Sequence, residues 1–163
     1  MKYILFGLIL HLAFSVSAND DKAIVTQASN NFNKKLIALE QVESKCRESA
    51  IVLPADTFKS VSLSKEDKIT ALSYYFIKST TECSSEAVKE LLVASAVLSS
   101  LDEAYEVAAI NSNKLIINSF KLLLEDEIEF NKIDKATREK LSKIHVLTKP
   151  FDPIRSAEVL GIH

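Results

Sequence analysis

The chain has 163 residues, 47% of them hydrophobic, and a formal net charge of −2, which suits one domain with a single core. A nearly balanced, slightly acidic chain has no electrostatic reason to bind nucleic acid or an anionic membrane. Only two glycines are present, which argues against tight β-hairpins, phosphate-binding loops and strained nucleophile turns, and favours a chain of helices.

Residues 1–18, MKYILFGLILHLAFSVSA, have the layout of a secretory signal peptide. Lys2 gives a positive start, an apolar run follows, and Val16 and Ala18 occupy the −3 and −1 positions of a cleavage site. The run of about 14 residues is shorter than the roughly 20 needed to span a bilayer, although an uncleaved anchor is the alternative interpretation. We therefore expect residues 19–163 to form a single helical domain in the periplasm or outside the cell, without membrane insertion after cleavage.

A long helix is expected at about 21–49, because its apolar residues recur at steps of three and four and so share one face. Cys46 continues that face. The next residues, 50–63, contain Pro54 and show no clean helical period. We interpret 50–63 as a long ordered crossover whose apolar side chains cover an edge of the core.

A capping box, SKED, predicts that the second helix begins at Ser64. Its apolar stripe continues to Cys83, where we expect this helix to end and another to follow at about 85–98. A second capping-box pattern, SLDE, predicts a helix break at 99–100, and the polar sequence at 111–113 is a further possible break.

Cys46 and Cys83 are the only cysteines, and in an exported chain they most simply form one structural disulfide. The alternatives are two free thiols, or a redox or metal role. A bridge would close a loop of about 38 residues, worth roughly 4 kcal/mol. Because both cysteines face inward near helical ends, we expect the first two helices to run parallel, or to cross steeply near their C-terminal ends, with 50–63 doubling back between them.

The segment at 114–130 is apolar nearly all round in its first half, so we expect it to be the central, most buried helix. Asp134 is a good N-cap for a helix at about 135–147. Near the C-terminus, Asp152 precedes a proline and Gly161 follows a short helical run, which predicts a helix at 153–160.

Together these elements predict an all-α fold. It is a single-domain, irregular helical bundle of about five to six helices, with one long crossover and one disulfide. The chain shows no internal repeat and no low-complexity segment.

An acidic cluster, EDEIE, begins at Glu125 and includes Asp126 and Glu129. It lacks the alternating acids and central glycine of a calcium loop, so no metal site is predicted. Lys121 and Lys132 lie three or four positions away and can offset the charge. The cluster is either a solvated face or an acidic patch that contacts a partner.

The adjacent residues Tyr74 and Tyr75 cannot both follow the apolar stripe that contains Phe76. One of them must therefore face away from this stripe. We expect core or boundary packing for the pair. The alternative is a binding surface, where an exposed tyrosine is a common interface anchor. His145 has no metal-ligating neighbour one turn away, and we expect it to be partly buried.

The sequence places no nucleophile beside a base and no serine in the glycine context of a nucleophile elbow. We therefore expect no catalysis, no metal and no cofactor. The leading hypothesis is an exported protein-binding module, such as an inhibitor, immunity-type protein, chaperone or adaptor, whose partner is another exported protein. The alternative is a carrier of a small apolar ligand, suggested by the apolar excess of residues 115–124. A hydrolytic enzyme using His145, or Glu125 with Glu129, is the third hypothesis.

Overall fold

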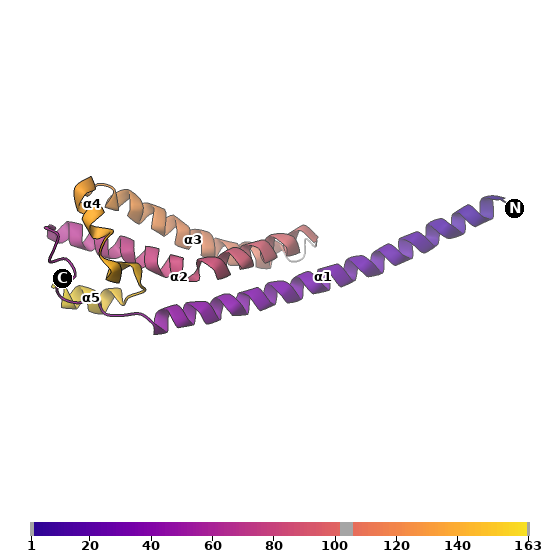
Figure 1. Ribbon diagram of the computed structural model, residues 1–163. Coiled ribbons are helices and arrows are strands. Elements are labelled where there is room, and N and C mark those ends of the chain that lie inside the picture. The colour runs from indigo at the N-terminus through magenta and orange to yellow at the C-terminus, as the bar shows by residue number, and fades with distance from the viewer. Residues whose placement is uncertain (1, 102–105, 163) are drawn as a thin grey trace.

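The computed structural model describes the backbone of residues 2–101 and 106–162, and the side chains of residues 21–101, 113–114 and 116–162. Within this part the chain forms helices and no β-strand, and one disulfide joins Cys46 to Cys83. The expected all-α domain is confirmed. The elements are α1 (Lys2–Glu48), α2 (Lys65–Leu101), α3 (Glu106–Phe130), α4 (Lys135–Leu141), the 3-10 helix η2 (His145–Thr148) and α5 (Pro153–Val159) (Figure 1).

The central helix is α2, not α3. Among the described residues α2 has Cα atoms within 8 Å of both α1 and α3, whereas no Cα atoms of α1 and α3 come that close to each other. Figure 1 shows α2 running between them. The prediction that the segment at 114–130 is the most buried helix is therefore wrong, because only one side of α3 meets a neighbour.

Helices α1 and α2 are antiparallel. Two contacts show this. The disulfide joins Cys46 of α1 to Cys83 of α2. Lys35, eleven residues earlier on α1, places its Nζ 2.9 Å from the carboxylate of Glu90, which is seven residues later on α2. The predicted parallel arrangement is wrong.

The crossover explains this antiparallel packing. Instead of doubling back, residues 50–63 continue past the end of α1, so that α2 begins well beyond it (Figure 1). Cys83 lies 18 residues after Lys65, which is about 27 Å along a helix. That offset brings Cys83 level with Cys46.

Helix α2 is continuous through 84–85 and 99–100, and residues 111–113 lie inside α3, so none of the three predicted breaks occurs. Serine hydroxyls along α2 donate to carbonyls three or four residues back, as Ser79 does to Phe76 O and Ser100 to Val97 O. These bonds satisfy serine inside a helix. The second half of the SLDE pattern falls on 102–105, outside the described residues.

Two apolar clusters form the core. The larger one contains the crossover, the first half of α2, the end of α3 and the C-terminal segment, and includes Leu53, Leu141 and Phe151. The crossover thus covers a core edge as predicted, although Val52 is exposed. The smaller cluster joins α1 to the second half of α2 and to Ile116 of α3.

The predicted C-terminal caps are confirmed. The Asp134 side chain accepts a hydrogen bond from the Thr137 backbone at the start of α4. Asp152 caps α5 with Pro153 at its first position, and Gly161 has a φ of 66° just past its end. However, the helix expected at 135–147 stops at Leu141, and the chain then forms η2.

Candidate binding groove beside the disulfide

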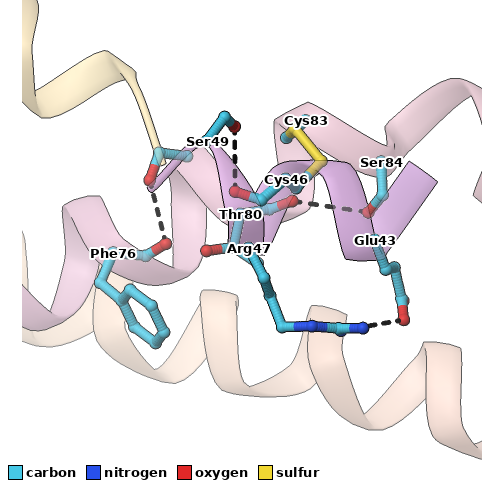
Figure 2. Close-up of a disulfide and its surroundings, with 9 residues drawn as sticks. Glu43, Cys46, Arg47, Ser49, Phe76, Thr80, Cys83 and Ser84 are labelled. Carbon is cyan, nitrogen blue, oxygen red and sulfur yellow. Dashed lines mark hydrogen bonds and ion pairs between the residues drawn. A yellow bond between two sulfur atoms is a disulfide. The ribbon is translucent and has the colours of Figure 1, made fainter. Parts of the chain in front are cut away.

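The disulfide joins the C-terminal end of α1 to the middle of α2, with Cα atoms 6.2 Å apart. This confirms the predicted pairing of Cys46 with Cys83. Cys46 is buried, but Cys83 is exposed, so only one of the two sulfur-bearing side chains faces inward as expected. Figure 2 shows the bridge with Glu43, one turn before Cys46 on α1, and with Arg47, the residue that follows Cys46.

A groove lies beside the bridge, between α1 and α3, with α2 as its floor. Its volume is about 320 Å³. The apolar lining comes from all three helices: Leu36 and Leu39 of α1, Val88 and Leu91 of α2, and Ile116 and Phe120 of α3.

The groove exists because α1 and α3, as far as the structure describes them, keep their Cα atoms more than 8 Å apart over α2. On both outer helices, α1 and α3, the apolar surface is wider than the part that packs against α2. On α1, Phe32 and Leu39 are buried against α2, whereas Leu36 lies at the edge and is only partly buried. Three helices side by side leave such edges open, while a fourth helix would close them.

A second hollow of about 260 Å³ adjoins the groove, and Glu43, Thr80 and Ser84 line both. Its other walls include Phe76 and Phe151. The combined depression therefore extends along α2 on both sides of the disulfide, from Phe76 to Leu91.

The polar groups of the groove lie mainly on α1. Glu40 and Glu43 are exposed on its rim, and Glu43 lies 3.8 Å from Arg47 in an exposed ion pair. On the floor, the Ser84 hydroxyl donates to the Thr80 carbonyl and is satisfied within its own helix (Figure 2). The site is thus an apolar trough with one acidic edge.

Tyr74 and Tyr75 are both buried, which agrees with the expected core packing and not with the alternative of an exposed binding surface. Tyr74 stacks on Phe130 with ring centroids 4.2 Å apart, and Tyr75 meets the same ring edge-on at 5.4 Å. Burial raises the pKa of Tyr75 to about 12, with a smaller contribution from Tyr74. These tyrosines hold α2 to the end of α3, and neither lines the groove.

The predicted acidic residues do not act together. Glu125 pairs with Lys121 at 3.5 Å and Glu129 with Lys132 at 2.6 Å, as their spacing predicted. Asp126 instead accepts a hydrogen bond from Ser73 of α2 at 2.8 Å. Among the described residues no group of three or more acids, histidines or cysteines could hold a metal ion.

His145 begins η2 and is exposed, contrary to the expected partial burial. Sequence reasoning found the apolar faces of the helices but missed that three of them would leave a groove. The sequence does not separate the groove-lining Leu36 from the buried Leu39, because a step of three places both on the same apolar face of α1.

Helix α3 also carries an exposed apolar stripe on its outer surface. Ile117, Phe120, Leu124 and Ile128 follow one another at steps of three, four and four, which places them on one face. Their exposed fractions are 59%, 40%, 61% and 62%. We call these four residues the α3 stripe, and only Phe120 also lines the groove.

Comparisons with known proteins identify no relative. No protein-family model, no curated protein and no solved structure matches the chain. Across the residues that the structure describes, no helix combines the length and apolar character needed to cross a membrane.

Proposed function

We propose that the chain is an exported protein-binding module, without catalysis of its own, that binds the apolar face of a partner helix in the groove between α1 and α3. The groove carries this proposal, because it is an apolar trough between two helices whose described Cα atoms stay more than 8 Å apart. Amphipathic helices bind in grooves of this kind. The partner helix would complete a four-helix arrangement.

The groove also defines the partner segment. Its floor runs from Thr80 to Leu91, which is about 17 Å of helix and matches roughly three turns of a partner. Three turns present two or three apolar anchors at positions i, i+3 or i+4, and i+7. The rim residue Glu40 forms no ion pair among the described residues, which favours a partner with Lys or Arg beside those anchors.

Export is part of the proposal. The disulfide is typical of an oxidising compartment, and residues 1–18 have the signal-peptide layout described above. Mass spectrometry of the protein from its native source should give a mature chain that begins at Asn19. A chain that retains residues 1–18 would contradict cleavage.

Photocrosslinking tests the groove with a matched pair of neighbouring sites. A photoreactive residue at Leu36 points into the groove, whereas the same residue at Ile37 lies on the outer face of α1, where Ile37 is 54% exposed. In the exported fraction of cells that make the protein, we expect Leu36 to crosslink one protein through a helical segment, and Ile37 not to. Equal crosslinking at both sites, or none at Leu36, would refute groove binding.

A small apolar ligand is the second candidate occupant, because the groove volume lies at the lower end of the range for ligand pockets. Native mass spectrometry should then detect a bound apolar molecule, and Thr81→Trp, which fills the groove, should remove it. Thr70→Trp on the same helix, outside the groove, is the control. A bare polypeptide in the native sample would dismiss the carrier.

A further inference from the structure

We infer that the α3 stripe is a self-association surface, on which a second copy of this chain places its own α3 in antiparallel orientation. This goes beyond partner binding in the groove, because three of the four stripe residues lie outside it. Leu124 and Ile128 are both more than half exposed, on a helix that packs on α2 along one side. A contiguous apolar surface of this kind marks an interaction site.

The spacing of the stripe is self-complementary. When two α3 helices run antiparallel about a two-fold axis, Phe120 lies opposite Leu124 of the second copy, and Ile117 lies opposite Ile128 of the second copy. Each pair recurs on the other side of the axis, which gives four apolar layers with the step pattern of a coiled-coil seam. A two-fold interface uses the same surface on both copies, as this register requires.

The charges beside the stripe select the antiparallel orientation. Lys121 and Glu125 lie on one flank, are 70% and 56% exposed, and pair with each other at 3.5 Å. In the antiparallel register Lys121 lies opposite Glu125 of the second copy, and Glu125 lies opposite Lys121 of the second copy. In a parallel register this flank would face the opposite flank of the second copy, so Lys121 and Glu125 would not pair across the interface.

The same charges argue against a lipid surface as the occupant. Helices that lie on anionic membranes carry Lys and Arg on their polar face. Here Glu125, Glu127 and Glu129 lie along the second half of α3, where an anionic membrane would repel them. The flank that carries Lys121 and Glu125 is better matched by a protein surface with both positive and negative charges.

The strength of the association follows from its size. Four partly exposed side chains cover less than the roughly 800 Å² per partner of a standard interface. We therefore expect a reversible dimer with a dissociation constant on the order of micromolar. Sedimentation equilibrium of the mature, disulfide-bonded protein, from about 1 µM to about 300 µM, covers that range.

Two substitutions on α3 form a matched test. Leu124→Glu places a charge in the stripe, whereas Leu122→Glu places the same charge at an exposed leucine about 200° around the helix from Leu124. We expect Leu124→Glu to abolish the dimer without lowering the melting temperature of the monomer, and Leu122→Glu to leave the dimer intact. A monomeric wild type throughout the concentration range, or equal effects of the two variants, would overturn the inference.

Cysteine pairing tests the register independently. When a Phe120→Cys chain is mixed with a Leu124→Cys chain under mild oxidation, we expect a disulfide-linked heterodimer in clear excess over either linked homodimer. Predominant homodimers of either variant would show a parallel register and refute the antiparallel one. In the Leu124→Glu variant we expect the photocrosslink from Leu36 to persist although the dimer is lost, because Leu124 does not line the groove. This measurement separates self-association from groove binding.

Discussion

The backbone N–H of Leu53 donates a hydrogen bond to the Ser156 hydroxyl at 3.0 Å, across 103 positions of sequence. Both residues are fully buried. Beside this bond, Ile51 N–H donates to Pro150 O, and Asp152 N–H donates to Ile51 O. The crossover is therefore fixed by the C-terminal segment, and this contact sets where α2 starts.

Replacing Ser156 tests how much that contact contributes. Ser156→Ala leaves the Leu53 N–H buried without a partner, which should lower the free energy of unfolding by about 1–3 kcal/mol. Ser142→Ala is the control, because the Ser142 hydroxyl is exposed and bonds within its own turn; it should change the value by less than about 0.5 kcal/mol. Denaturant titration with the disulfide intact measures both, and equal small effects would contradict the role of Ser156.

Removing the disulfide should destabilise the protein and loosen one wall of the groove. The bridge joins residues 37 positions apart, so the double substitution Cys46→Ala with Cys83→Ala should cost about 2–4 kcal/mol in unfolding free energy. Intact-mass measurement with an alkylating reagent provides the direct check on the wild type. Two adducts without prior reduction would show that the bridge is absent from the natural protein.

Substituting the two described phenylalanines of α3 should lower stability to very different extents. Phe130 is buried between Tyr74 and Tyr75, so Phe130→Ala should lower the unfolding free energy by about 3–5 kcal/mol. Phe120 is 40% exposed, and Phe120→Ala should cost less than about 1.5 kcal/mol when the protein is dilute enough to be monomeric. Thermal unfolding followed by circular dichroism compares them, and similar losses would contradict the two environments.

Local signals in the sequence predicted local structure well. The caps formed by Asp134 and Asp152, with Gly161 after the last helix, act within a few residues and are read directly from the chain. The disulfide was predictable because only two cysteines exist. The ion pairs of Lys121 and Lys132 followed from helical spacing alone.

The direction of α2 was not predictable in the same way. Whether 50–63 doubles back or continues onward depends on contacts with residues near Phe151 and Ser156, about a hundred positions away. A helix that is apolar nearly all round does not reveal how many neighbours it has. The described part of α3 packs against one long helix, α2, and this leaves the α3 stripe exposed. The groove results from the same arrangement.

Tyr75 should make the stability of the protein fall at high pH. Its pKa is raised from 10.0 to about 12, chiefly by burial, so the folded state keeps its proton where the unfolded chain has lost it. The free energy of unfolding should not depend on this group below pH 10, should fall as the pH rises from 10 towards 12, and should change no further above that value.

Urea titrations of the wild type and of Tyr75→Phe across this pH range check the expectation. The phenylalanine variant keeps the ring packing against Phe130 but has no hydroxyl to titrate. Its unfolding free energy should therefore decline less steeply between pH 10 and pH 12 than that of the wild type. Parallel declines would mean that another group, and not Tyr75, senses the pH.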